Sequence, residues 1–305
     1  MKTTTTKTKR KYTKRNAAFW GTGATKASSA KVEKAAPAVK RARKAVDTTE
    51  AAPTSMVRKL NIGVTGPQKF SAIDVPDLLR TSVATSWPEI DALFTGEGIR
   101  PSTVTLVTGL PGAGKTTLNL QLADKLVALG HTVLVNSCEE SGAQLKIKLE
   151  KLGLDNLISD GYHASLDEVG EILAEAEKLR ALTPKGKQFF LFIDSIQHVE
   201  KAQEGRGRRL SEQNQAIAAV CDIASWCKST MAVAMVIGQV NKDGEFEGRQ
   251  ALKHVIDCHL HLHQDTDRKS ETYKQRVAEM LKNRMGGSGL YFVYDINSSG
   301  ITFQG

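Results

Sequence analysis

A glycine-rich segment at residues 109–116 is the part of the sequence with the clearest chemistry. It is Gly-Leu-Pro-Gly-Ala-Gly-Lys-Thr, which matches the phosphate-binding pattern Gly-x-x-x-x-Gly-Lys-Thr. In such a loop the backbone N–H groups surround phosphates, the lysine reaches the β- and γ-phosphates, and the threonine hydroxyl joins the shell of a Mg²⁺ ion. We therefore predict that ATP is bound by Gly109, Leu110, Pro111, Gly112, Ala113, Gly114, Lys115, Thr116 and Thr117, and that Thr116 also contacts Mg²⁺.

Three carboxylates occupy positions suited to act on those phosphates. Asp194 follows the apolar run Phe189–Ile193, and Glu139 and Glu140 follow the run 133–138. In open α/β sheets, ligands bind at the edge where the carboxyl ends of parallel strands meet. We predict that Asp194 holds Mg²⁺, partly through water, and that Glu139 or Glu140 orients the attacking water. A helix cap is the alternative role for Asp194.

Alternating strand-like and helix-like segments surround these residues from about Thr81 onward. Short apolar runs predict buried strands at Val104–Thr108, 133–135, Phe189–Ile193 and Met231–Ile237. Apolar stripes at helical spacing predict helices over Lys115–Leu129, through Leu145 and Leu149, from Leu166 to Leu179, and over 217–224. The last third is richer in strands, at Cys258–His263, Arg276–Leu281 and Leu290–Ile296. This order predicts an α/β fold with a mostly parallel central sheet, flanking helices and a strand-rich C-terminal part.

Positive charge is concentrated at the N-terminal end of the chain. The 305 residues include 42 Lys and Arg against 33 Asp and Glu, a net charge of +9. Residues 1–55 hold 14 basic and 3 acidic residues, a net +11, which leaves 28 basic and 30 acidic residues, a net −2, in the remainder. Because residues 1–55 are poor in apolar side chains, we predict a disordered basic tail there, a linker at 56–80 and a nucleotide-binding domain at 81–305.

The composition also bears on partners and compartment. Basic clusters at 9–15 and 40–44 suit contact with nucleic-acid phosphates, with a nuclear or organellar address or an inert tail as alternatives. The sequence has no apolar run of the length that a membrane helix needs, about 18 residues, so we expect no membrane partner. The four cysteines form no Cys-x-x-Cys pair, which predicts a reduced compartment. We expect a cytoplasmic protein associated with nucleic acid.

From about Arg80 to Phe303 the sequence resembles the RecA-type core of the RadA/Sms family of DNA-repair ATPases. Four segments share the family's pattern, namely 85–98, 136–141, 194–197 and 240–257. The most specific match is residues 282–286, Lys-Asn-Arg-Met-Gly, which departs from the family's Lys-Asn-Arg-Phe-Gly only at Met285. We expect the chain to lack the family's N-terminal zinc module and C-terminal Lon-like domain.

The resemblance implies a RecA-like P-loop fold and an activity. We expect a DNA-dependent ATPase that acts in DNA recombination or repair, through strand annealing, strand exchange or branch migration. Its implied partners are single-stranded DNA and further copies of the chain, in a ring or filament with active sites at the subunit interfaces. The alternatives are a DnaB-type replicative helicase motor, and a nucleic-acid coating or packaging protein that uses nucleotide as an assembly switch.

The resemblance also implies roles for individual side chains. Glu139 is expected to be the base that activates water, and Gln239 the sensor of the γ-phosphate, although a strand-end glutamine is often a turn former. Lys282 and Arg284 are expected to reach a neighbour's γ-phosphate, with DNA or a surface carboxylate as the alternative target. Cations in two loops are expected to contact the DNA backbone, or else to lie in solvated loops: Arg206, Arg208, Arg209, Lys242, Arg249 and Lys253.

Three histidines have a spacing that is also found in metal sites. His259, His261 and His263 alternate along a predicted strand and therefore lie on one face of it, a spacing that can hold zinc. The leucines between them already explain the strand, and a fourth ligand would have to be Asp265 or Asp267. We favour a structural role for the three histidines and leave metal binding as the alternative.

Overall fold

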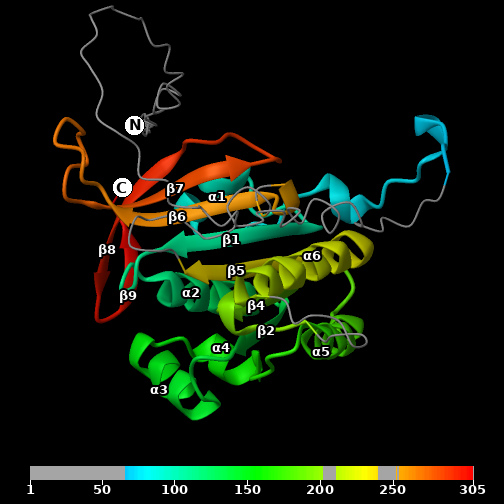
Figure 1. Cartoon of the computed structure of the whole chain (residues 1–305), viewed down its shortest axis with the longest axis horizontal. Helices are drawn as coiled ribbons and strands as arrows, with labels where there is room; N and C mark the ends of the chain where they lie inside the picture. Colours follow the sequence, from blue (N-terminus) through cyan, green and yellow to red (C-terminus); the bar gives the residue numbers. More distant parts are fainter. Residues whose placement is uncertain (1–65, 202–210, 240–251, 253, 305) are drawn as a thin grey trace, which may run out of the picture.

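The computed structural model of the chain describes residues 66–201, 211–239, 252 and 254–304 (Figure 1). Its strands are β1 (Thr103–Gly109), β2 (Thr132–Ser137), β3 (Tyr162–Ala164), β4 (Phe189–Asp194), β5 (Val233–Gln239), β6 (Cys258–Gln264), β7 (Arg276–Asn283), β8 (Tyr291–Asn297) and β9 (Gly300–Phe303). Its α-helices are α1 (Pro88–Phe94), α2 (Lys115–Ala128), α3 (Gly142–Leu152), α4 (Asp155–Asp160), α5 (Val169–Ala181) and α6 (Glu212–Thr230). Short 3₁₀ turns are η2 (Phe70–Ala72), η3 (Asp77–Arg80) and η4 (Ile196–His198).

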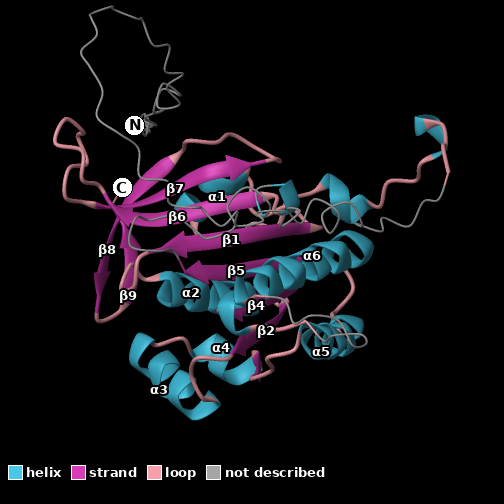
Figure 2. Cartoon of the chain, in the orientation of Figure 1, coloured by secondary structure: helices cyan, strands magenta, loops and turns pink. Residues whose placement is uncertain are grey.

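The described strands form one mixed sheet in the order β3-β2-β4-β5-β1-β6-β7-β8-β9. Neighbours from β3 to β6 pair in parallel, and β6 to β9 pair antiparallel. The parallel part alternates with helices along the chain, whereas the antiparallel part is joined by short connections. Figure 2 shows this division, with α2, α4, α5 and α6 around the parallel strands and α1 beside β7. The predicted α/β fold with a strand-rich C-terminal part is therefore confirmed.

Two apolar cores lie on opposite faces of the sheet. On one face α2 buries Leu118, Leu122 and Leu126 against alternate residues of β1, β2 and β4. On the other face α5 and α6 cover the remaining residues of the same strands, including Leu106 and Leu191. Because both faces are covered, β4 is a nearly continuous apolar run, and β1 is buried along its whole length although three of its residues are threonines.

Local signals set the start and end of the helix nearest the predicted carboxylates. The Ser141 hydroxyl accepts a hydrogen bond from the Gln144 N–H, and the Gln144 side chain accepts one from the Ser141 N–H. This capping box begins α3 directly after Glu139 and Glu140. Gly153 ends the helix with φ 65°, a left-handed conformation that glycine adopts without strain. The acidic pair is thereby fixed in the short connection between β2 and α3.

Several segments differ from the predicted boundaries. The predicted helix from Leu166 begins only at Val169, because the Glu168 carboxylate accepts hydrogen bonds from the N–H groups of Gly170 and Glu171 and caps it. Leu166 instead pairs with the side chain of Asn136 through its own N–H and carbonyl. Elements that were not predicted are α1, α4, β3 and β9. The predicted basic tail lies outside the described residues, and none of the described helices is long and apolar enough to span a membrane.

Candidate active site

The glycine-rich loop connects the end of β1 to the start of α2, as its sequence predicted. Gly109 has φ 155°, and a Cβ there would collide with the backbone carbonyl of Leu262 on β6. Gly114 has φ 92° at the N-cap of α2, and a Cβ there would press on Ile296 of β8. Any side chain at either position would strain the backbone, and at Gly109 it would also collide with the backbone of a neighbouring strand. The loop conformation therefore requires glycine at both positions.

The antiparallel strands support the loop from outside. The Tyr294 hydroxyl on β8 donates a 2.7 Å hydrogen bond to the Ala113 carbonyl, and burial raises the pKa of this phenol to about 12. The Arg276 guanidinium at the start of β7 donates a 3.2 Å bond to the Gly112 carbonyl. With its outward carbonyls held in this way, the loop keeps one conformation in which its N–H groups can receive phosphates.

Lys115 lies over the loop. Its ammonium donates to the carbonyls of Gly109 at 2.8 Å and Leu110 at 3.2 Å. Burial lowers the pKa of this lysine, and the nearby carboxylates of Asp194 and Glu139 partly oppose that shift. A cation held at the mouth of the loop between two carboxylates is suited to meet the charge of bound phosphates.

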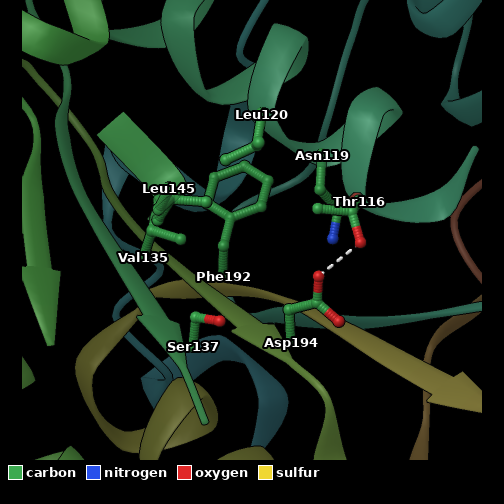
Figure 3. Close-up of a pocket in the computed structure, with 8 residues that line it drawn as sticks. All are labelled: Thr116, Asn119, Leu120, Val135, Ser137, Leu145, Phe192 and Asp194. Atoms are coloured by element: carbon green, nitrogen blue, oxygen red, sulfur yellow. Dashed lines mark hydrogen bonds between the residues drawn. The ribbon is translucent and has the colours of Figure 1, made fainter. Parts of the chain in front are cut away.

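Thr116 and Asp194 meet across the sheet edge. The Thr116 hydroxyl donates a 2.5 Å hydrogen bond to Asp194 Oδ2, which joins the first turn of α2 to the end of β4 (Figure 3). Burial raises the pKa of Asp194, the Thr116 hydrogen bond opposes this shift, and the Glu139 carboxylate adds to it. A hydroxyl and a carboxylate placed together are oxygen ligands of the kind that Mg²⁺ prefers, so these residues fit the predicted metal.

The two adjacent glutamates have different surroundings. Glu140 is bound by the Lys148 ammonium at 2.6 and 2.7 Å, so its charge is paired on α3. Glu139 Oε1 instead accepts hydrogen bonds from the Ser195 hydroxyl at 2.6 Å and from Gln239 Nε2 at 3.0 Å. Of the two glutamates, Glu139 is therefore the one that contacts residues at the ends of β4 and β5, and its role as the base stays a prediction.

Gln239 lies at the same sheet edge because β5 and β1 are in register there. Its Cα pairs with that of Gly109, the first residue of the loop. Its side chain reaches Glu139, and its carbonyl accepts a 3.3 Å hydrogen bond from Gln197 Nε2 on η4. Gln239 thus joins the loop, the glutamate and η4, the position that a sensor of the terminal phosphate needs, and its sensor role stays a prediction.

A small cavity lies behind Thr116 and Asp194, between α2 and the ends of β2 and β4 (Figure 3). Its volume is about 10 Å³, close to the space of one water molecule. Asn119, which is only 4% exposed, lines it with Ser137, and neither amide atom of Asn119 has a hydrogen-bond partner in the structure. An ordered water at this position would satisfy Asn119 and support the Asp194 carboxylate from behind.

Lys282 and Arg284 lie at the opposite end of the sheet from the loop. Lys282 donates to the Ile256 carbonyl at 2.6 Å, and Arg284 contacts Asp257 at 3.3 Å. The Asp257 N–H binds the Val104 carbonyl near the start of β1, five residues before Gly109. Five strand residues span roughly 16 Å. The structure therefore separates these cations from the loop of their own chain.

The remaining predicted residues are placed as follows. Arg206, Arg208, Arg209, Lys242, Arg249 and Lys253 lie outside the described residues. Thr108 Oγ1 lies 2.7 Å from His259 Nε2 and 2.8 Å from His261 Nδ1, so this hydroxyl joins two of the histidines on β6 to the strand that carries the loop. Within the described ranges, no group of three or more His, Cys, Asp and Glu side chains is arranged to hold a metal.

Sequence reasoning missed several residues of this site. Ser195 and His198 surround Glu139, with His198 Nδ1 lying 3.4 Å from Glu139 Oε1 and 3.2 Å from Ser195 Oγ. Asn119 was hidden inside an apolar helix pattern, where a single polar residue is the only signal. Arg276 was read as the start of a strand, and only the antiparallel pairing of β7 brings it to the loop.

Comparisons with known proteins agree with this geometry. The family described as "ATPase: KaiC" matches residues 83–305. The chain is 32% identical over 249 residues to the DNA repair protein RadA of Escherichia coli strain K12, covering 78% of this chain and 48% of that protein. It is 28% identical over 250 residues to RadA of Streptococcus pneumoniae strain R6, covering 80% and 54%. The chain therefore spans about half the length of these curated relatives.

A solved structure supports the fold alone. A DnaB-like replicative helicase, described together with its interactions with primase, superposes with a TM-score of 0.61 at 18% identity. The match covers 72% of this chain and 61% of the helicase chain. Such a likeness identifies the RecA-like architecture without distinguishing among its activities.

Proposed function

Because the chain belongs to the KaiC family of ATPases and is a RadA-like RecA-type ATPase, we propose that it is a DNA-dependent ATPase acting in DNA recombination or repair. The finer activities proposed are strand annealing, strand exchange or branch migration. The observation that carries the proposal is that Lys115, Thr116, Asp194, Glu139 and Gln239 gather at one sheet edge. Relatives described as DNA repair proteins support DNA as the partner.

Each side chain has a proposed task in hydrolysis. The loop N–H groups and Lys115 bind the phosphates, and the Lys115 charge offsets the charge that develops on the γ-phosphate. Thr116 and Asp194 hold Mg²⁺, which when bound neutralises phosphate charge. Glu139 accepts a proton from the attacking water, and Ser195 and Gln239 hold its carboxylate in place. Because the Gln239 side chain contacts Glu139, it is proposed to respond when the γ-phosphate is bound or lost and to transmit that change along β5.

We propose that Lys282 and Arg284 complete the site of a neighbouring copy. Their position at the far end of the sheet supports this proposal, since roughly 16 Å along the strands separates them from the loop of their own chain. A guanidinium supplied by a second subunit makes hydrolysis depend on assembly. The assembly proposed is therefore a ring or filament with one nucleotide at each interface.

DNA contact is proposed for Arg206, Arg208 and Arg209 in the segment 203–209, for the cations Lys242, Arg249 and Lys253 that flank residues 243–248, and for the basic tail. The protein is proposed to act in the cytoplasm. Deleting residues 1–55, which carry a net +11, should weaken binding to single-stranded DNA most strongly at low salt. Each lost phosphate contact should remove roughly 0.7 from the slope of log affinity against log salt. Fluorescence titrations at several salt concentrations measure this, and identical slopes for both proteins would exclude the tail as a DNA arm.

The proposal is tested by ATP hydrolysis with and without single-stranded DNA. Turnover should rise when the DNA is added, and the same preparation should anneal complementary strands. The fold likeness to a DnaB-like helicase favours one alternative, a motor that processively unwinds forked DNA. Unwinding of a labelled fork without annealing would favour that helicase motor, and turnover that ignores DNA would contradict the proposal.

A further inference from the structure

Asp257 is a buried carboxylate that the nucleotide site does not use. It precedes β6, its side chain is 1% exposed, and it lies at the sheet end opposite the phosphate-binding loop. Its Oδ2 accepts hydrogen bonds from the Val104 N–H at 3.0 Å and the Lys228 ammonium at 2.8 Å. Its Oδ1 lies 3.3 Å from Arg284 Nη1. Three separate elements therefore meet on one carboxylate: β1, the last turn of α6, and the residue after β7.

The two cations on Asp257 are held unequally. Lys228 is 19% exposed and also donates a 2.6 Å hydrogen bond to the Ser102 carbonyl. Arg284 is 41% exposed and makes the longer contact. Lys228 supplies a counter-charge to Asp257 and the Val104 N–H supplies a hydrogen bond, so the carboxylate stays paired even without Arg284. Lys228 is therefore the more buried and more closely bound partner of Asp257, and Arg284 is the more exposed one.

The backbone around Arg284 is fixed by the same residue. The Arg284 N–H donates to the Asp257 carbonyl at 3.0 Å, and the Asp257 N–H donates to the Val104 carbonyl at 2.9 Å. Arg284 Nη2 donates to the His254 carbonyl at 2.6 Å. Within the described part of the chain these contacts use two of the five N–H donors of the guanidinium. The remaining donors make no hydrogen bond within the described part of the chain, and because the side chain is 41% exposed they can reach solvent.

Building on the proposed action of Arg284 at a neighbour's nucleotide, we propose that Asp257 is the positioning residue for this arginine. Its carboxylate, anchored by Lys228 and β1, directs the guanidinium outward from the sheet edge toward the phosphates bound by the adjacent copy. The charge on Asp257 matters because a charge-assisted hydrogen bond orients a guanidinium more firmly than a neutral one. Asp257 thereby links the start of β1 to the cation that the neighbouring site needs.

The test uses Asp257→Asn, which has the same shape and can still accept from the Val104 N–H but carries no charge. ATP turnover should fall about tenfold, while binding of a fluorescent ATP analogue stays unchanged, because the variant's own nucleotide site is intact. Asp160→Asn, an exposed residue at the end of α4, is the matched control and should behave as wild type.

Two readouts separate positioning from a structural effect. Adding Asp257→Asn to Arg284→Ala should cause no further loss of turnover, because the arginine through which Asp257 acts is already missing. Asp257→Asn subunits mixed with Lys115→Ala subunits should regain activity, as each supplies what the other lacks. Asp257→Asn alone could unfold the protein, because it leaves the Lys228 charge buried without a counter-charge. In that case the double variant Asp257→Asn, Lys228→Met, which removes both charges, is used in place of Asp257→Asn in the same comparisons.

Three results would overturn the inference. Wild-type turnover in Asp257→Asn would show that Arg284 needs no carboxylate. A further loss when Asp257→Asn is added to Arg284→Ala would show that the carboxylate acts through the fold. If Lys115→Ala subunits rescue Arg284→Ala but do not rescue Asp257→Asn, the carboxylate also acts through the fold. If Arg284→Ala subunits are not rescued either, the proposed action between subunits fails, and the positioning role with it.

Discussion

The two ends of the same sheet hold charged groups in different ways. At the carboxyl ends of β1, β4 and β5 the polar groups bind one another across the strands, as Thr116 binds Asp194 and Gln239 binds Glu139. At the other end, Lys282 and Arg284 bind a backbone carbonyl and a single buried carboxylate. Strand β7 spans both regions, with Arg276 at the loop and Lys282 at the far end.

This difference supports the proposal that the two ends of the sheet take part in different active sites. The loop end gathers the residues proposed to bind phosphate, to hold Mg²⁺ and to activate water, so in this proposal one chain binds the nucleotide and prepares the water. The far end contains the cations Lys282 and Arg284, which contact backbone carbonyls and the buried Asp257. This arrangement supports the proposal that each end of one chain contributes half of an active site and that a second copy supplies the other half.

The largest expected effect comes from breaking the loop end at Lys115. Lys115→Ala removes a cation whose interaction strengthens as charge develops on the γ-phosphate, so turnover should fall by at least about a hundredfold. Thermal melting followed by circular dichroism should show an intact fold. Turnover near the wild-type value in this variant would show that residues 109–116 are not the catalytic loop.

A matched pair of variants sharpens the assignment of the base. Glu139→Gln should lower kcat about a hundredfold, because an amide cannot accept the proton of the attacking water. Glu140→Gln should change kcat by less than about threefold, since Glu140 is paired with Lys148 on α3. Steady-state kinetics compares the two, and equal losses, or a larger loss for Glu140→Gln, would reverse the assignment.

A smaller effect is expected from pH at the metal ligands. Because burial raises the pKa of Asp194, its carboxylate becomes protonated at a higher pH than that of an exposed aspartate. A protonated carboxyl binds metal poorly, so the Mg²⁺ concentration for half-maximal turnover should rise several-fold as pH is lowered toward that pKa. Mg²⁺ titrations at a series of pH values measure this, and a requirement that stays constant down to the usual pKa of aspartate would contradict it.

Much of the loop end could be predicted from sequence because local patterns determine it. The phosphate loop has a fixed spacing, and Asp194 and Glu139 each follow an apolar run that must be a buried strand. Parallel pairing then brings the ends of those strands to one edge. Only the finer contacts were missed, such as Ser195 and His198 around Glu139, since these depend on side-chain packing in η4.

The far end could not be predicted in the same way. The segment 282–286 was recognised from its resemblance to a family, but nothing in the sequence connects Arg284 with Asp257 or Lys228. That connection depends on the antiparallel register of β6 and β7, which includes an irregularity between His259 and Leu260. Register over such distances is set by tertiary packing, so the carboxylate that holds Arg284 becomes visible only in the folded chain.

The division of the active site between two copies is tested most directly by mixing two inactive variants. Lys115→Ala subunits retain Arg284, and Arg284→Ala subunits retain the loop, so random assembly at equal amounts should complete about a quarter of the interfaces. Each variant alone should hydrolyse little ATP. In the mixture the two variants should assemble with each other and recover a measurable fraction of wild-type turnover. No recovery, with co-assembly confirmed by light scattering, would contradict the account.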